Sequence, residues 1–190
     1  GVSTYSGATT IAAGVLNADS TNALGDGSAT NTLIFTGGTL QAGGTITSPS
    51  TRGVTLTSTG IIDTNGNTVT LGGIAAGAGG LTKQGAGTLI LSGVNTYTGA
   101  TTITTGTLAL DATGTIETSS GVANAGALTI AASKTIDSMT GAGTTGLGAF
   151  TLTIGDTDNT SSTYAGIASG TGGLTTGGTG TLTLSGVQAY

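Results

Sequence analysis

Short apolar and threonine-rich segments separated by glycine corners constrain the fold of this chain more than any other feature. The clearest unit runs from Gly85 to Leu110 and reads GAGTLILSGVNTYTGATTITTGTLAL. Its first segment, Thr88–Ser92, places Leu89 and Leu91 on one face, as a half-buried strand does. No part of the unit has the caps or the 3.6-residue period of a helix. We therefore predict three short β-strands here, the second and third at 101–104 and 107–110.

The unit recurs at a long period. Residues 1–16, GVSTYSGATTIAAGVL, match residues 93–108, GVNTYTGATTITTGTL, at a shift of 92. Residues 178–190, GTGTLTLSGVQAY, match residues 85–97, GAGTLILSGVNTY, at a shift of 93. A chain with such internal repetition is expected to be a solenoid or an array.

The recurrence sets the expected domain organisation. We predict one continuous segment over residues 1–190, with a first period at 1–92, a second at 93–185 and the start of a third at 186–190. The chain starts and stops in the same phase of the motif, at GVSTY and GVQAY. It therefore reads as an excerpt of a longer tandem array, or as a filament subunit that is continued end to end.

The unit follows the pattern Gly-x-Gly-Thr-Leu-x-Leu-Ser-Gly-x-Asn-Thr-Tyr-x-Gly-x-Thr-x-Ile-x-x-Gly-Thr-Leu. This pattern resembles the autotransporter-associated β-strand repeat, also called the passenger-associated transport repeat, of bacterial autotransporter adhesins. Residues 85–110 match almost throughout, residues 1–16 carry the second half and residues 178–190 the first half. The motif Asn is replaced by Ser3 and Gln188, and a motif Thr by Ala189. The resemblance implies a right-handed parallel β-helix exported across an outer membrane, and it carries over no catalytic residues.

The spacing of strand centres independently favours a solenoid. Apolar centres fall about every seven residues, and three such steps make a rung of roughly 20 to 25 residues. About four rungs fit each period, and eight rungs stacked about 4.8 Å apart make a rod on the order of 40 Å long. The centres are Leu33, Leu40, Ile46, Val54, Ile61 and Val69.

Each rung offers too few inward positions to form a core alone, so neighbouring rungs must stack to complete one interior. A sandwich or jelly roll uses the same alternation, but neither needs a long period. The predicted fold class is all-β: a right-handed parallel β-helix of about eight rungs in two 92–93-residue periods. The predicted inward positions of the central unit are Leu89, Leu91, Ile103, Leu108 and Leu110.

Two further features receive structural interpretations. The polar segment 17–28, NADSTNALGDGS, is predicted to be a loop that leaves the regular body. Tyr5, Tyr97 and Tyr190 share one motif position. We interpret them as rings packed over a corner rather than as ligand-stacking rings.

Composition excludes several function classes. Three Lys and Arg residues face eight Asp and Glu residues, too few cations to neutralise a track of phosphates. We therefore expect no nucleic-acid partner. The apolar runs are too short to span a bilayer, so we expect no membrane insertion within this segment. One proline and 6% charged residues argue against disorder, and glycine lacks the triplet spacing of collagen.

The residues offer little for catalysis. His and Cys are absent, which removes the usual general base and most transition-metal sites. Asp156 and Asp158 are the nearest carboxylate pair and leave a glycan hydrolase of β-helix type as a remote alternative. They align with Asp63 and Asn65 of the first period, which favours a capped turn over an ion site. We predict no catalytic, cofactor-binding or metal-ligating residues and no cofactor.

Pairs of threonines two residues apart raise a second alternative, an ice- or surface-binding face. Each pair puts two hydroxyl groups on one face of a strand, but the pairs are irregularly spaced, and threonine suits any exposed strand position. The pairs are Thr45/Thr47, Thr55/Thr57, Thr68/Thr70, Thr102/Thr104, Thr151/Thr153 and Thr181/Thr183.

The sequence therefore predicts a structural or adhesive β-solenoid segment of a large bacterial autotransporter-like surface protein, located outside the cell at the outer membrane and not an enzyme. Because neither end looks like a polar cap, we expect neighbouring copies of the same repeat as partners, stacked head to tail, in the limit as a homopolymer filament. The sequence does not identify a host receptor or glycan.

Overall fold

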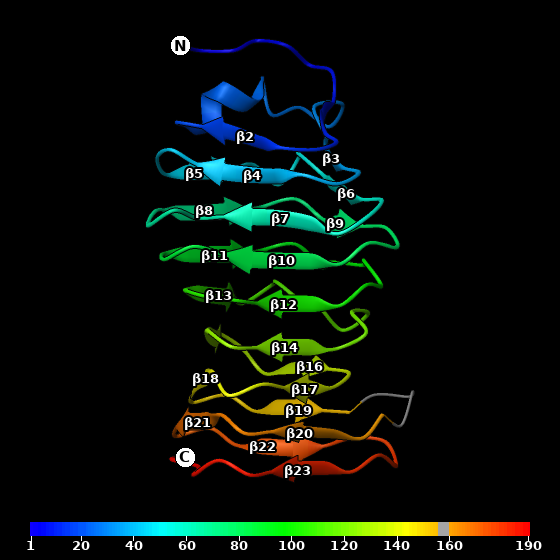
Figure 1. The fold of residues 1–190 in the computed structure, drawn as a ribbon, viewed down its shortest axis with the longest axis vertical. Helices are drawn as coiled ribbons and strands as arrows, with labels where there is room; N and C mark the ends of the chain where they lie inside the picture. The colour runs from blue at the N-terminus through cyan, green and yellow to red at the C-terminus, as the bar shows by residue number, and fades with distance from the viewer. Residues whose placement is uncertain (156–159) are drawn as a thin grey trace.

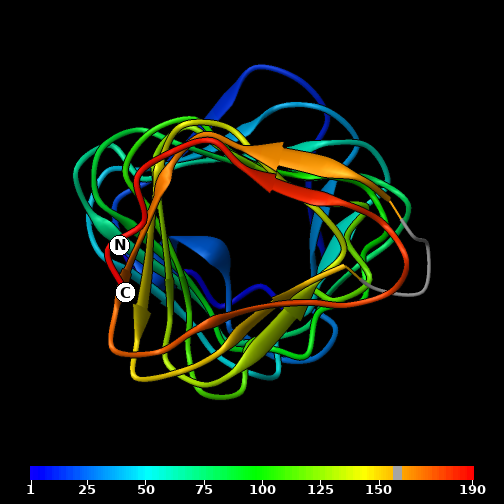
Figure 2. The same ribbon diagram turned by 90° about the horizontal axis from the view of Figure 1, so that it is seen from below.

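The computed structural model describes residues 1–155 and 160–190. The chain winds into a column of stacked turns with the N-terminus at one end and the C-terminus at the other (Figure 1). Seen along the column, each turn is a rounded triangle, and successive turns rise toward the viewer counterclockwise (Figure 2). The winding is therefore right-handed, and the predicted right-handed parallel β-helix is confirmed.

Each turn has three sides, and every pairing between neighbouring strands is parallel. The first side holds β1 (Thr9–Ile11), β3 (Leu33–Phe35), β6 (Val54–Leu56), β9 (Ala75–Ala76), β16 (Lys134–Ile136), β19 (Leu152–Ile154) and β22 (Leu174–Thr176). The second side holds β2 (Val15–Ala18), β4 (Thr39–Ala42), β7 (Gly60–Asp63), β10 (Leu81–Gln84), β12 (Thr101–Ile103), β14 (Val122–Asn124), β17 (Met139–Thr140), β20 (Ser162–Tyr164) and β23 (Leu182–Leu184). The third side holds β5 (Ile46–Ser48), β8 (Thr68–Leu71), β11 (Thr88–Leu91), β13 (Thr107–Leu110), β15 (Ala127–Ile130), β18 (Thr144–Gly148) and β21 (Ile167–Gly170).

The elements within residues 1–155 and 160–190 account for eight complete turns, followed by β22 and β23 of a ninth. On the first side, between β9 and β16, two passes of the chain form no strand and are joined to each other by the isolated bridge Val94↔Thr115 and by further backbone hydrogen bonds. No helix within the described residues is long and apolar enough to cross a membrane.

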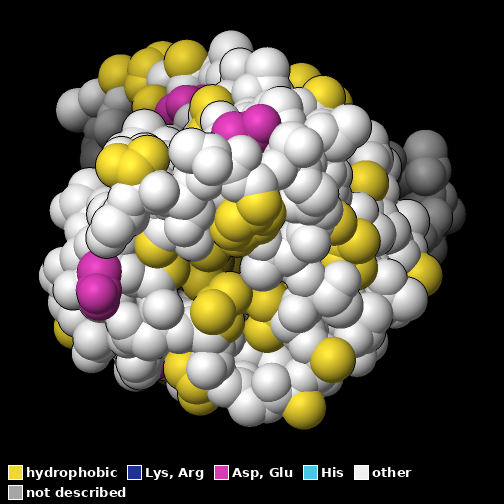
Figure 3. Space-filling model, turned by 90° about the horizontal axis from the view of Figure 1, so that it is seen from above, with side chains coloured by type: hydrophobic (Ala, Val, Ile, Leu, Met, Phe, Trp, Pro, Cys, Tyr) yellow, Lys and Arg dark blue, Asp and Glu magenta, His cyan; other side chains and the backbone are white. Residues whose placement is uncertain are grey.

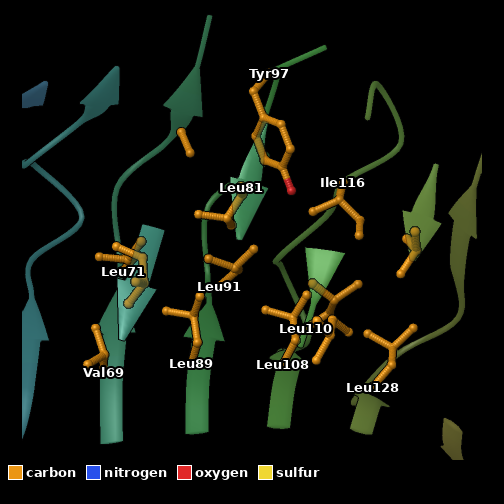
Figure 4. Packing of buried hydrophobic residues seen from close by; sticks show 14 of the residues in the cluster. Val69, Leu71, Leu81, Leu89, Leu91, Tyr97, Leu108, Leu110, Ile116 and Leu128 are labelled. Atoms are coloured by element: carbon orange, nitrogen blue, oxygen red, sulfur yellow. The ribbon is translucent and has the colours of Figure 1, made fainter. Parts of the chain in front are cut away.

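The core is one continuous interior formed by columns of stacked side chains. On the third side, Val69, Leu89, Leu108 and Leu128 are register partners in successive turns. They are fully buried, and Figure 4 shows their side chains in a row inside the ribbon. All five predicted inward positions of the central unit are at most 1% exposed, so their prediction is confirmed. The strand alternation determines which side chains point inward, and in-register stacking lines them up.

The predicted loop at residues 17–28 is wrong in its first half. Asn17 and Ala18 end β2, and the short 3-10 helix η1 (Thr21–Leu24) then takes the place of a third-side strand in the first turn. Ala18 and Leu24 are both 1% exposed, so the segment contributes to the core. The Thr21 hydroxyl also accepts a hydrogen bond from the Thr47 backbone N–H at 2.7 Å, which fixes η1 against the next turn.

The long sequence repeat does not keep to one side of the triangle. The matching segments β1 and β12 lie on the first and second sides, whereas β11 and its match β23 lie on the third and second sides. Each pass of the chain along one side of the triangle can be counted as one step. Matching segments are then 13 steps apart across the first period and 14 steps apart across the second. Together they make nine whole turns, so Gly1–Tyr5 and Gly186–Tyr190 both belong to the third side. Each period thus contains more than the four expected turns.

Candidate functional site

The most elaborate polar arrangement of the central repeat is a buried chain of hydroxyl groups. The Tyr97 hydroxyl lies 2.6 Å from Thr101 Oγ1, which lies 2.9 Å from Ser119 Oγ, and Ser119 donates to the Gly99 carbonyl at 3.0 Å. The Tyr97 ring is fully buried and lies with Leu81 and Ile116 in the interior (Figure 4). Burial raises the pKa of Tyr97 well above its ordinary value. The group therefore stays neutral and hydrogen-bonded at physiological pH, which suits packing and not acid–base chemistry.

Asn95, the motif asparagine, joins three successive turns where the first side has no strands. Its Oδ1 accepts a hydrogen bond from the Ala75 backbone N–H at 2.8 Å, and its Nδ2 donates to the Thr115 carbonyl at 2.9 Å. The side chain is 3% exposed and satisfies backbone groups that a β-ladder would otherwise pair. Gln188 occupies the matching place 93 residues later, and its Oε1 accepts from the Ala168 N–H at 2.9 Å. The replacement of Asn by Gln therefore keeps this contact.

Lys83 occupies an inward position of β10 between the register partners Ile62 and Ile103. Its side chain is fully buried, and its Nζ donates to the carbonyls of Gln84, Gly85 and Thr105 at 3.1, 2.6 and 3.0 Å. Desolvation lowers the pKa of Lys83 to about 8, although Asp63 opposes this shift.

The ammonium group of Lys83 closes a corner and binds two turns together. Gly106 borders it with a backbone φ of +68°, and a Cβ at this position would lie 2.6 Å from Lys83 Nζ. A side chain there would therefore meet both backbone strain and the ammonium group.

The other two cations are also inside the solenoid. Arg52 is fully buried, and its guanidinium donates to Asn31 Oδ1 at 2.7 and 2.9 Å and to the Leu24 carbonyl at 3.0 Å. Lys134 is 6% exposed and donates to the Ala112 carbonyl at 3.0 Å. Burial lowers the pKa of both groups. All three Lys and Arg residues of the chain thus hold corners together, and none is displayed on the surface.

Three of the described carboxylates cap turns. In Asp26, Asp63 and Asp111 alike, Oδ1 accepts a hydrogen bond at 2.9 Å from the backbone N–H two residues ahead. The predicted capping role of Asp63 is therefore confirmed, and its Oδ2 also accepts from Gln41 Nε2 at 2.9 Å. Asp156 and Asp158 lie outside the described residues. Within residues 1–155 and 160–190 there is no group of three metal-ligating side chains, and these residues enclose no pocket.

The threonine pairs lie on all three sides of the column. Two pairs lie on the third side, two on the first and two on the second. Only Thr47 and Thr70 of neighbouring turns are register partners, and the next residues in that column are Ile90 and Ala109. These pairs therefore form no continuous flat array of hydroxyl groups, and nothing in their arrangement favours ice binding.

The tyrosines outside the central copy differ from Tyr97 in burial or in their place in the sequence. Tyr5 and Tyr190 are 43% and 48% exposed, so the predicted packing over a corner is confirmed in full only for Tyr97. Tyr164, outside the motif, is fully buried, and its hydroxyl donates to the Gly143 carbonyl at 2.6 Å. Gly166 lies close to this side chain, since a Cβ at Gly166 would lie 2.5 Å from the Tyr164 hydroxyl. A tyrosine two residues before a glycine was the available signal.

Two comparisons with known proteins find related sequences. The family described as passenger-associated-transport-repeat matches residues 1–18 and 81–110. The expected partial copy at 178–190 lies outside these two ranges. The chain is 39% identical over 214 aligned residues to a protein named adhesin BmaC autotransporter from Brucella suis biovar 1 (strain 1330). The alignment covers all of this chain and 6% of that relative, so the chain spans a small part of its length.

No solved structure matches the chain significantly. The family match and the adhesin relative nevertheless point to the same kind of protein as the fold. Residues 1–18 and 81–110 match the passenger-associated transport repeat, and the chain is a β-solenoid that is similar over its whole length to a small part of an autotransporter adhesin.

Proposed function

We propose that this chain is a structural and adhesive segment of a large autotransporter-like surface protein and that it has no enzymatic activity of its own. Autotransporter passenger repeats imply exposure at the cell surface or secretion. The finer assignment, to the outer-membrane surface of a bacterium, is part of the proposal.

The observation that carries this proposal is the unbroken stacking of turns from β1 to β23. Among the described residues, each turn pairs with the turns before and after it, and the buried hydrophobic residues form one cluster along the column. Such a body behaves as a rod whose length grows with the number of turns. At about 4.8 Å per turn, the segment contributes a spacer on the order of 40 Å.

The surface supports a role outside the cell. Proteases that cleave after Lys or Arg must bind that side chain, and here all three are 0–6% exposed and hydrogen-bonded to corner carbonyls or to Asn31. The folded chain should therefore resist trypsin-like enzymes. The exposed ionised side chains are carboxylates such as Asp19, Asp26 and Glu117, which keep the rod soluble and disfavour contact with anionic polymers.

We also propose a role in export, which the same architecture supports. A solenoid can fold turn by turn, because each new turn adds to a strand edge already in place. Folding outside the membrane would then favour forward movement of the chain. The bond network of Asn95 and Lys83, which links neighbouring turns, would stabilise each turn as its successor docks.

The proposal is tested by displaying the segment on bacteria as the passenger of an autotransporter barrel and by preparing the same segment in soluble form. We expect antibody labelling of intact cells, resistance of the displayed segment to trypsin, and saturable binding of the soluble segment to host cells or matrix. Binding without catalysis supports an adhesive rod, whereas display and trypsin resistance without binding restrict its role to that of a spacer. Failure to reach the cell surface, or rapid cleavage there, would contradict the proposal.

A further inference from the structure

Asn65 is the asparagine of this chain that its sequence context makes most prone to chemical change. Of the eight Asn residues, it is the only one followed by Gly, whereas the others are followed by Ala or Thr. Asparagine is among the chemically labile residues, and its side chain reacts when the amide nitrogen of the next residue attacks it. Glycine leaves that nitrogen unhindered and its backbone free to rotate. The dipeptide Asn65–Gly66 lies exposed in the corner between β7 and β8.

The reaction expected at this dipeptide is deamidation, with water as the co-reactant. Hydroxide removes the Gly66 amide proton, and the nitrogen attacks Cγ of Asn65. A bond forms between that nitrogen and Cγ, the Cγ–Nδ2 bond breaks, and ammonia leaves after taking a proton from water. Water then opens the resulting succinimide ring at either carbonyl carbon. The product at position 65 is aspartate or, with the main chain running through Cβ and Cγ, isoaspartate.

The folded corner holds the two reacting atoms apart. The Asn67 N–H donates to the Thr64 carbonyl at 2.7 Å, and φ is +47° at Asn65 and +84° at Gly66. These are the features of a type I′ turn, in which ψ of the first central residue is about +30°. The succinimide ring requires the Gly66 nitrogen to be nearly eclipsed with Cβ of Asn65, whereas this ψ puts the nitrogen roughly 150° away. The ring can therefore form only after the turn has opened.

The neighbouring turns keep the corner closed. The Gly66 N–H, whose nitrogen is the nucleophile, donates to the Ala86 carbonyl of the next turn at 2.7 Å. The Thr64 hydroxyl donates to the same carbonyl at 2.5 Å, and the Thr64 side chain is fully buried. On the other side, Asn65 Nδ2, the leaving group, donates to the Ala42 carbonyl of the preceding turn at 3.3 Å. The nucleophile and the leaving group are thus both engaged by stacked turns.

We propose that Asn65–Gly66 is a self-modification site that the stacking of turns switches off: the chain deamidates there while it is unfolded and is protected once the turns have stacked. The corner is fixed at both ends by register, with Asp63 opposite Gln84 and Thr68 opposite Thr88. Isoaspartate adds a carbon to the main chain between these fixed points. A chain modified before stacking therefore cannot close this corner in the same register, and position 65 records how long the chain has waited to fold.

The aspartate product is also disfavoured in the folded corner. It replaces the Nδ2 donor by an oxygen that faces the Ala42 carbonyl, and it adds a negative charge to a chain whose net charge is already −5. All three Lys and Arg side chains are buried and bound to groups inside the column. Figure 3, which looks onto the N-terminal end, shows carboxylates on the surface and no Lys or Arg side chain. No cation of this chain is thus displayed where it could pair with the new carboxylate.

The test compares the same chain folded in mildly alkaline buffer and unfolded in guanidinium chloride at the same pH. Each sample is then fully unfolded and digested with trypsin, and the peptide 53–83 contains both Asn65 and the control Asn67, which is followed by Thr. In the unfolded chain we expect deamidation at Asn65 to be much faster than at Asn67. In the folded chain, deamidation at Asn65 should be roughly 10 to 100 times slower, because the corner must first open against its hydrogen bonds.

Loosening the corner should restore part of the reaction without unfolding the chain. Thr64→Val keeps the size of the side chain but removes the hydroxyl that binds the Ala86 carbonyl. We expect deamidation in native buffer to become roughly tenfold faster, with the rate in guanidinium chloride unchanged. Thr102→Val is the matched control, because it removes a hydroxyl from the outward face of β12, two turns away, and should leave the rate unchanged.

Hydrogen exchange and refolding of the unmutated chain keep the test independent of a variant that fails to fold. The Gly66 amide should exchange slowly in the folded chain, because it is bonded to the next turn. When a chain aged in guanidinium chloride is returned to buffer, isoaspartate at position 65, detected by isoaspartate-specific enzymatic methylation, should be concentrated in the molecules that do not refold. Equal deamidation of folded and unfolded chains, equal rates in Thr64→Val and Thr102→Val, rapid exchange of Gly66 or equal isoaspartate in both fractions would overturn the proposal.

Discussion

Two copies of one motif, Gly1–Tyr5 and Gly93–Tyr97, have the same local chemistry but different surroundings. In the first copy the Tyr5 hydroxyl lies 2.8 Å from Thr9 Oγ1, and in the middle copy the Tyr97 hydroxyl lies 2.6 Å from Thr101 Oγ1. Yet Tyr5 is 43% exposed and Tyr97 is fully buried. The contact four residues apart is therefore a local property of the motif, whereas burial depends on whether another turn covers it.

The largest expected difference between the two copies comes from removing the ring. Tyr97→Ala should lower the free energy of unfolding by about 3–5 kcal/mol, the usual range for truncating a buried aromatic side chain. Tyr5→Ala should cost about 1 kcal/mol or less, since its ring remains largely in water. Urea unfolding of both variants measures the difference. Similar losses in the two would show that burial is not what separates the copies.

A smaller effect is expected from the motif amide. Asn95→Ala leaves the buried Ala75 N–H without its partner, and an unsatisfied buried donor costs about 1–3 kcal/mol. Gln188→Ala removes the matching bond to Ala168 in the last turns, where water can replace it more easily. Thermal unfolding should therefore show a clear drop in Tm for the first variant and a slight one for the second. The reverse order would contradict the assigned role of Asn95.

Removing one hydroxyl group tests the relay itself. Thr101→Val keeps the size of the side chain but breaks the link between Tyr97 and Ser119, and we expect a loss of about 1 kcal/mol. Thr9→Val removes the same contact to Tyr5 at the exposed end and should be close to neutral. Chemical unfolding of Thr101→Val and Thr9→Val measures this difference. Unfolding of Tyr97→Phe alone and of Tyr97→Phe combined with Thr101→Val then completes a double-mutant cycle. Full additivity of the pair would argue against a coupled hydroxyl chain.

The smallest effect at neutral pH is expected from the titration of Lys83, because its ammonium group loses its proton only in alkaline solution. Its pKa is lowered to about 8 in the folded chain against 10.5 in the reference state. Between these values the unfolded chain binds more protons than the folded chain, so stability should rise as pH increases from about 8 to 10.5. Lys83→Met should lose the part of this rise that Lys83 contributes, whereas Ile74→Asp, at a side chain that is 51% exposed, should keep it. Unfolding curves across this pH range decide the matter, and a fall in wild-type stability over the same window, absent in Lys83→Met, would reverse the sign assigned here.

Much of the fold could be predicted because alternation along a strand states which side chains point inward. Leu89, Leu91 and Leu108 were identified from the sequence and are buried. Strand β10 is harder to recognise in the sequence, because Lys83 occupies an inward position. A hydrophobic pattern would place a lysine at the surface. The polar segment 17–28, which contains η1, was assigned to a loop for a similar reason, since its only buried hydrophobic side chains are those of Ala18 and Leu24.

The sequence by itself determined the strand-forming segments, the glycine corners, the inward face of each strand and the local tyrosine–threonine contact, because these depend on residues within a few positions of one another. Only the tertiary structure decided that the two periods advance by 13 and 14 sides, that Asn95 binds the turns on either side of it, and that Lys83 finds three carbonyl partners in the interior. Each of these depends on a neighbouring turn about 20 residues away, whose position is set by the combined lengths of all the corners between. The sequence repeat therefore specifies where the strands form, whereas the stacking of turns specifies which side chains and backbone groups each strand contacts.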